Sequence, residues 1–178
     1  MTTILLARHG ETDWNRERRW QGWADPPLND TGRAQARELA DRLRDTPFDA
    51  VYSSDLRRAH ETAEIVAAPH GVPVVADERL REVDIGSWSG LLHSEVEERY
   101  PDGVRPDGET REEHAARVIS AVEEIARENL GRRILIVTHG GSIRALRGGA
   151  ADVPSAWIPN CEVFELEFRD DRLVAPIG

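Results

Sequence analysis

Apolar residues occur in this chain as short continuous runs, and longer amphipathic segments separate these runs. Continuous apolar runs are typical of strands that are buried on both faces of a parallel sheet. The runs predict strands over Ile4–Ala7, Ala50–Tyr52, Val72–Val75 and Ile134–Thr138.

The segments between these runs carry apolar residues at helical spacing. In the first of them Thr31 is a candidate N-cap, and apolar positions then recur every three or four residues as far as Arg44. Similar spacing predicts further helices over Arg57–Ala68, Arg111–Glu128 and Ser142–Arg147. Residues 91–110 are polar and contain several prolines and glycines, so we expect no regular element there.

A different pattern appears near the carboxyl end, where Phe164, Leu166 and Phe168 alternate with glutamates. Strict alternation predicts a half-buried strand, and Asp170-Asp171 then forms a turn into Leu173–Val174. The alternation of strands and helices along the chain predicts an α/β fold. We expect one domain over residues 1–178, a three-layer α/β/α sandwich with a mostly parallel central sheet and one antiparallel strand.

Composition and charge restrict the function classes. The net charge is −10, and all 23 basic residues are arginine. An acidic exterior argues against nucleic acid or an anionic membrane as a partner. The chain shows neither a transmembrane run nor a signal-peptide pattern at its start, and its single cysteine cannot form an internal disulfide. We therefore expect a cytoplasmic protein, and the pattern predicts no oligomeric state.

Two of the predicted strands end in a histidine followed by glycine. Arg8-His9-Gly10 follows the first apolar run, and Thr138-His139-Gly140 closes another. Ligands of open α/β sheets bind at the carboxyl ends of the strands. A neutral histidine is a good nucleophile toward phosphorus, and arginine holds phosphate oxygens well. The two sites therefore indicate phosphoryl chemistry, although one such motif alone is also typical of polar residues where a strand meets a loop.

Two other segments strengthen this interpretation. Arg58 lies near the predicted start of a helix, where free backbone N–H groups and the helix dipole favour a phosphate. Glu82 lies among apolar residues just before a glycine-containing turn at Gly86. Two further acidic residues, Glu78 and Asp84, lie close to it along the chain.

With these four segments the chain resembles the histidine phosphatase superfamily, in its phosphoglycerate-mutase-like branch, from Ile4 to about Phe168. The resemblance makes His9 the nucleophile that becomes phosphohistidine. It makes Glu82 the proton donor, with Asp84 and Glu78 as nearby competitors for that role. It implies further that Arg8, Arg58 and His139 surround the phosphoryl group. Expected substrate contacts are Asn15, Gln21, Gly22 and the backbone N–H of Gly140.

This chemistry requires no cofactor and no metal, because the arginines supply the positive charge. The four other histidines, His60, His70, His93 and His114, show no ligand spacing, and no HxH or HExxH pattern occurs. We interpret them as structural or surface residues. The tryptophans near the predicted site either line a pocket or pack loops against the core, and packing is their commoner use.

The resemblance leaves the reaction class open. Mutases of the family usually carry a Glu-Arg-His-Tyr-Gly segment at the proton donor and a long insertion with basic residues, whereas this chain has Glu82-Val83-Asp84-Ile85-Gly86 and a short polar segment. This difference favours a metal-independent phosphomonoesterase that acts on a small phosphorylated metabolite. The alternatives are a cofactor-dependent phosphoglycerate mutase and a non-catalytic protein that binds a phosphorylated ligand. The variable segments Trp14–Pro27 and Trp88–Glu109 are expected to form the pocket wall.

Overall fold

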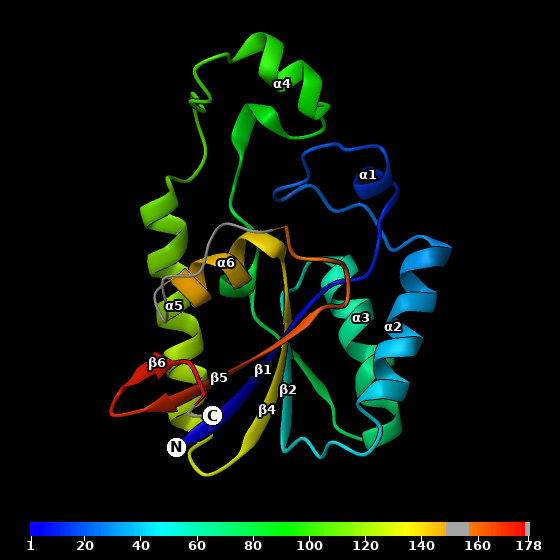
Figure 1. The fold of residues 1–178 in the computed structure, drawn as a ribbon, viewed down its shortest axis with the longest axis vertical. Coiled ribbons are helices and arrows are strands. Elements are labelled where there is room, and N and C mark those ends of the chain that lie inside the picture. The colour runs from blue at the N-terminus through cyan, green and yellow to red at the C-terminus, as the bar shows by residue number, and fades with distance from the viewer. Residues whose placement is uncertain (149–156, 177–178) are drawn as a thin grey trace.

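The central sheet has six strands in the order β3-β2-β4-β1-β5-β6 (Figure 1). The structure is a computed structural model that describes residues 1–148 and 157–176. The strands are β1 (Thr2–Arg8), β2 (Ala50–Ser53), β3 (Val74–Ala76), β4 (Arg133–Thr138), β5 (Val163–Arg169) and β6 (Arg172–Val174). Every predicted strand is present, and the third begins two residues later than its apolar run.

Strands β1 to β4 pair in parallel, whereas β5 runs antiparallel to both β1 and β6. The predicted mostly parallel sheet with one antiparallel strand is therefore confirmed. In the β1–β4 pair, Arg8 lies opposite Thr138. This register brings the two residues that follow, His9 and His139, side by side at one end of the sheet.

Helices cover both faces of the sheet, as the three-layer prediction requires (Figure 1). Because side chains alternate along a strand, Leu5 and Ala7 of β1 point to the face covered by α2 (Asp30–Arg42) and α3 (Arg57–Ala67). Ile4 and Leu6 point to the other face, where α5 (Arg111–Glu128) and α6 (Gly140–Gly148) pack. Each face thus has its own apolar core.

The predicted N-cap of α2 was wrong. The helix begins at Asp30, and Asn29 caps it, because the Asn29 side chain accepts a hydrogen bond from the Gly32 N–H at 2.8 Å. Thr31 lies inside the first turn and is exposed. Asparagine and threonine are both common N-caps, and the backbone hydrogen bond that decides between them is not visible in the pattern.

The sequence analysis predicted neither of two short helices, and the second lies in the polar segment 91–110, where no regular element was expected. They are α1 (Asp13–Arg16) and α4 (His93–Arg99). In α4 the Glu95 carboxylate accepts the Leu92 N–H at 2.7 Å, and Val96 is buried in a small cluster with Trp88. Tertiary packing therefore stabilises a helix of weak periodicity, and α4 stands away from the sheet, beyond its carboxyl end (Figure 1). Short 3-10 turns complete the described elements: η1 (Ala68–His70), η2 (Glu78–Leu80) and η3 (Gly86–Trp88).

In the described parts of the chain, none of the helices combines the length and the apolar character that a membrane span requires.

Candidate active site

The two strand-terminal histidines lie together at the carboxyl end of the sheet. The rings of His9 and His139 meet edge to face, with their centroids 5.1 Å apart. The His9 backbone N–H also donates to the Thr138 carbonyl at 3.0 Å, which ties the ends of β1 and β4 together. Both side chains are buried. The predicted pairing of the two motifs in space is therefore present.

The hydrogen bonds of His9 define which nitrogen can react. His9 Nδ1 lies 2.7 Å from the Gly10 carbonyl oxygen. Because a carbonyl oxygen only accepts, Nδ1 carries the hydrogen and Nε2 keeps its lone pair. Burial lowers the pKa of His9 well below its ordinary value, and the positive charges of Arg58 and Arg8 lower it further. His9 is thus a neutral imidazole with a free Nε2, which is the form that a nucleophile needs.

Arg8 ends β1, and the loop before β5 holds its side chain. Its guanidinium donates to the Ile158 carbonyl and lies against the Trp157 ring, 4.7 Å from the ring centroid. Burial lowers the pKa of Arg8 to about 10, so the group remains charged near neutral pH. Its Nε is buried and finds no hydrogen-bond partner among the described residues.

Arg58 lies in the first turn of α3 and is almost fully buried. It donates to the carbonyls of Gly22 and Ala24, at 2.8 and 2.7 Å, and so ties the loop between α1 and α2 to the site. Burial lowers its pKa also to about 10, while nearby carboxylates, Glu82 first, oppose that shift. As with Arg8, the buried Nε has no partner in the described part of the chain.

His139 is held by Ser54, which follows β2. His139 Nε2 lies 2.8 Å from the Ser54 hydroxyl oxygen, which already accepts the Leu56 N–H. The Ser54 hydroxyl is free to donate to Nε2, an arrangement that leaves the ring hydrogen on Nδ1. Nδ1 is buried without a partner among the residues described. Burial, Arg58 and His9 all lower the pKa of His139.

Glu82 reaches the site from the loop after η2. Its Oε2 accepts the Gly141 N–H at 2.9 Å, and its Oε1 accepts the Val83 N–H at 3.0 Å. A Cβ on Gly141 would lie 2.1 Å from Oε1, so the glycine is required for this approach. Trp23 and Arg117 donate to the Glu82 carbonyl at 2.8 and 3.1 Å. The carboxylate is thus fixed through both its oxygens and its own backbone.

The predicted neutral donors are oriented by Thr12. The Thr12 backbone N–H donates to Asn15 Oδ1 at 3.1 Å, and its hydroxyl donates to Gln21 Oε1 at 2.8 Å. Both amide oxygens are therefore engaged, which leaves the NH₂ groups of Asn15 and Gln21 as the donors toward the cavity. The next residue, Gly22, has φ +50°, and a Cβ there would lie 2.4 Å from Ile85 Cγ1. Only glycine suits this position.

A cavity of about 590 Å³ opens above His9. All predicted site residues line it except His139, which is buried next to His9. The lining predicted from the sequence is Arg8, His9, Asn15, Gln21, Gly22, Arg58, Glu82 and Gly140. The described residues contain no group of three or more His, Cys, Asp or Glu that could hold a metal ion.

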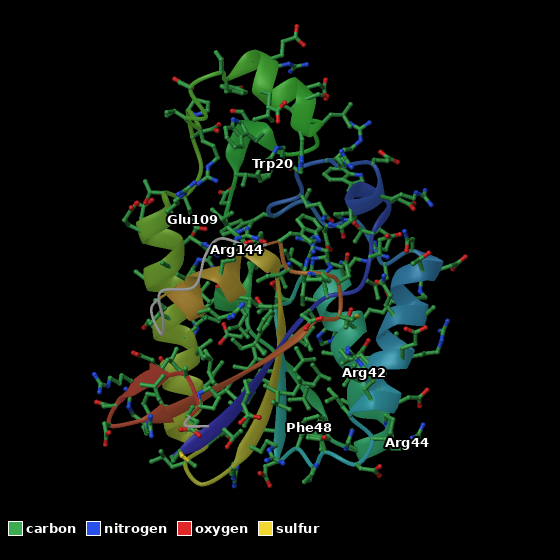
Figure 2. The ribbon with its side chains drawn as sticks, in the orientation of Figure 1. Trp20, Arg42, Arg44, Phe48, Glu109 and Arg144 are labelled. Atoms are coloured by element: carbon green, nitrogen blue, oxygen red, sulfur yellow. The ribbon has the colours of Figure 1, made fainter. Side chains whose placement is uncertain are left out.

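Arg18 and Arg19 line the cavity from the Trp14–Pro27 segment, which was expected to form part of the pocket wall. Sequence reasoning missed the other residues of the wall, namely Val83, Ile85, Gly141, Arg144 and Trp157. Trp20 also lines the cavity, and His93, which we interpreted as structural or surface, faces it against the Trp20 ring at 4.7 Å between centroids. Figure 2 shows Trp20 and Arg144 toward the carboxyl end of the sheet and Phe48 at its opposite end. No motif marks these positions, which lie in loops and on the helices α4 and α6.

Comparison with known proteins now decides the family. Residues 4–175 match the sequence profile of the histidine phosphatase superfamily (branch 1). The chain belongs to this superfamily. Both the resemblance stated above and the assignment to the phosphatase class of enzymes are thereby confirmed.

Individual relatives cover nearly the whole chain. The "uncharacterized phosphatase PhoE" of Bacillus subtilis (strain 168) is 36% identical over 97% of this chain and 91% of its own length. "Phosphoglycerate mutase-like protein 4" of Arabidopsis thaliana is 41% identical over 95% of this chain and 81% of its own. "Phosphoserine phosphatase 1" of Hydrogenobacter thermophilus is 32% identical over 91% of this chain and 83% of its own.

Solved structures of the superfamily share the fold. YhfR of Bacillus stearothermophilus superimposes with a TM-score of 0.91 at 35% identity, over 97% of this chain and 94% of that one. The mycobacterial glucosyl-3-phosphoglycerate phosphatase Rv2419c, in complex with VO3, gives a TM-score of 0.84 at 33% identity, over 93% of this chain and 92% of that one.

Proposed function

We propose that this protein is a metal-independent phosphomonoesterase that acts through a phosphohistidine on His9. One observation carries the proposal. Three buried nitrogens close to the His9 site, namely Arg8 Nε, Arg58 Nε and His139 Nδ1, have no partner among the described residues. Buried donors are rarely left unpaired in folded proteins. Arg8 and Arg58 line the cavity with His9, so phosphoryl oxygens bound there would pair with these two cationic groups.

The first half of the reaction forms the phosphoenzyme. His9 Nε2 attacks phosphorus as the bond to the leaving oxygen breaks, and the charge that spreads over the equatorial oxygens meets Arg8, Arg58 and His139. The leaving oxygen keeps the bonding electron pair and takes a proton from Glu82. Asn15, Gln21 and the Gly140 N–H, all at the cavity wall, then hold the outer oxygens.

The second half returns the enzyme to its starting state. Glu82 accepts a proton from water as the water oxygen bonds to phosphorus, and the P–N bond breaks with its electron pair returning to Nε2. The same carboxyl group thus acts first as acid and then as base. Its two backbone hydrogen bonds keep it in one place for both steps.

The proposed substrate is a small phosphorylated metabolite. The cavity of about 590 Å³ holds a compact molecule rather than a polymer. Relatives named for phosphoserine and glucosyl-3-phosphoglycerate support substrates of this size. The acidic net charge of −10 supports the proposal that neither nucleic acid nor an anionic membrane is a partner.

Rapid quench of the enzyme with labelled substrate tests the intermediate. We expect an acid-labile, base-stable phosphoenzyme that is absent from the His9→Ala variant, which should also lose nearly all turnover. Label on another residue, or substantial activity of His9→Ala, would show that the nucleophile is misassigned.

Incubation with 3-phosphoglycerate and catalytic 2,3-bisphosphoglycerate tests the reaction class. We expect release of inorganic phosphate and little 2-phosphoglycerate, because water is the proposed acceptor. Interconversion of the two monophosphates faster than hydrolysis would replace the phosphatase proposal with the mutase alternative.

A further inference from the structure

The cavity above His9 carries more positive charge than one phosphoryl group requires. In the described part of the chain five arginines and a single carboxylate line it, although the net charge of the chain is −10. The five are Arg8, Arg18, Arg19, Arg58 and Arg144. The proposed mechanism uses Arg8 and Arg58, and Arg19 pairs with Glu17 at 2.7 Å. The remaining two arginines add positive charge that a phosphoryl group at His9 leaves unused.

One of these two, Arg144, lies beside a guanidinium of the phosphoryl site. It lies on α6, about one turn after Gly140, and its side chain is exposed. A Cβ built on Gly140 would lie 3.5 Å from Arg8 Nε and 3.6 Å from Arg144 Nη1, so the two side chains flank the same glycine. No described carboxylate forms an ion pair with Arg144. Two like charges thus lie close together, and an anion bound between them would offset their repulsion.

The position of Glu82 shows on which side of the phosphoryl group the alcohol part of a substrate lies. The leaving oxygen stands opposite His9 in an in-line transfer, and Glu82 is the group proposed to protonate it. Glu82 is followed by Val83 and accepts the Gly141 N–H at 2.9 Å. The alcohol part of the substrate therefore lies next to Val83 and Gly141.

A second cavity, of about 790 Å³, begins at the same two residues. Trp20, Val83, Gly141 and Arg144 line both cavities, whereas His9 and Arg8 line only the first. Among these shared residues of the described chain, Arg144 alone carries a charge. Figure 2 shows Trp20 and Arg144 toward the carboxyl end of the sheet, where the site lies. A substrate that extends from the first cavity toward the second therefore passes Arg144.

We propose that Arg144 is a specificity-determining residue that binds a second anionic group, a carboxylate or a second phosphate, on the alcohol part of the substrate. The inference rests on the proposed function, because that function places the leaving oxygen beside Glu82. A guanidinium binds either anion through paired N–H donors. The phosphoryl group would then lie at Arg8 and the second anion at Arg144.

Three esters of a two-carbon alcohol test the inference: ethyl phosphate, 2-phosphoglycolate and ethylene glycol bisphosphate. We expect kcat/KM of the wild-type enzyme to be about tenfold higher for at least one of the two acidic esters than for ethyl phosphate. Arg144→Gln should lower kcat/KM about tenfold for that ester and at most about threefold for ethyl phosphate. Arg144→Lys, which keeps the charge, should retain part of the preference. The acidic ester that loses more identifies the second anion as carboxylate or phosphate.

Arg147→Gln is the matched control. Arg147 also lies on α6, and its substitution removes the same charge. Its guanidinium packs over the Phe164 ring, 4.0 Å from the ring centroid, and it lines neither cavity. We expect wild-type kcat/KM on all three esters from this variant.

Binding to His9→Ala tests the same preference without turnover and without any effect of the leaving group. By calorimetry we expect the preferred acidic ester to bind this variant about tenfold more tightly than ethyl phosphate, and we expect added salt to reduce the difference. Adding Arg144→Gln to His9→Ala should remove most of the difference. The comparison of the esters in His9→Ala alone remains decisive even if Arg144→Gln does not fold.

Two results would overturn the inference. One is equal affinity of the three esters for His9→Ala. The other is an equal loss on all three esters in a folded Arg144→Gln, which would show that Arg144 acts on the phosphoryl group or on the fold. Failure of the proposed function looks different: wild type would hydrolyse none of the esters, while their affinities for His9→Ala could still differ.

Discussion

Replacing Glu82 with glutamine separates its chemical role from its structural one. Glutamine has one acceptor oxygen, so it can keep only one of the two backbone hydrogen bonds, from Gly141 at 2.9 Å or from Val83 at 3.0 Å. Loss of one such bond costs about 1 kcal/mol, or about fivefold if all of it appears in the transition state. Loss of the transferable proton costs ~10²–10⁴-fold.

Two substrates distinguish the loss of the hydrogen bond from the loss of the transferable proton. We expect Glu82→Gln to reduce kcat/KM about fivefold for p-nitrophenyl phosphate, whose leaving group departs without a proton. For a simple alkyl phosphate we expect the full loss of ~10²–10⁴-fold, because an alkoxide is a poor leaving group. The assay is steady-state kinetics on both esters at several pH values, with the same protein preparations.

Glu64→Gln is a suitable control, because this carboxylate lies on α3 with 60% of its side chain exposed and does not line the cavity. It should behave as wild type on both esters. An equal loss on the two esters in Glu82→Gln would refute the general-acid assignment and leave His9 as the nucleophile.

Three further predictions follow from the site. Hydrolysis of p-nitrophenyl phosphate should survive EDTA, because Arg8 and Arg58 supply the positive charge; loss with chelator and recovery with magnesium or zinc would contradict this mechanism. The fold lowers the pKa of His9, so the unfolded chain binds more protons below about pH 6.5, and the free energy of unfolding decreases as the pH is lowered there. In urea unfolding, His9→Gln should reduce the dependence of that free energy on pH by about 1.4 kcal/mol per pH unit. An unchanged pH dependence would show that His9 titrates normally. Gly22→Ala should destabilise the protein by about 2 kcal/mol or more and reduce activity, because strain adds to the contact with Ile85. Its control is Gly71→Ala, which also has positive φ but nothing within 4 Å, and which should cost only about 1 kcal/mol and leave activity unchanged.

The parts of the fold that the sequence predicted are those in which local pattern and burial agree. The helix Arg111–Glu128 has the predicted bounds, and its buried side chains repeat at helical spacing. The strand with alternating Leu166 and Phe168 is also half-buried as expected. Asp170 and Asp171 both have positive φ, which suits the predicted tight turn. In contrast, α4 has little periodicity and forms because Val96 packs against Trp88, a contact that no local pattern contains.

The residues of the candidate site also include some that the sequence could predict and some that it could not. Residues at strand and helix ends, such as His9, His139 and Arg58, could be predicted because the sheet topology places such ends together. Glu82 could be predicted only through the family resemblance. Trp157 could not, because its position depends on how the loop before β5 folds. Arg144 could not, because the helical spacing predicts α6 but not which of its side chains reaches the cavity. His114 is buried, although its polar neighbours along the chain gave no sign that its side chain turns inward.

The two arginine side chains of the site, Arg8 and Arg58, each hold a loop of the cavity wall. Arg8 donates to the Ile158 carbonyl, and Arg58 donates to those of Gly22 and Ala24. A change of loop sequence that moves one of these carbonyls therefore also rotates the plane of a guanidinium group. For protein engineering this means that the 21–24 and 157–160 loops cannot be grafted from a relative independently. If these loops are changed so that the cavity accepts a substrate with a different alcohol group, the change also alters the positions of Arg8 and Arg58 and therefore the rate of phosphoryl transfer.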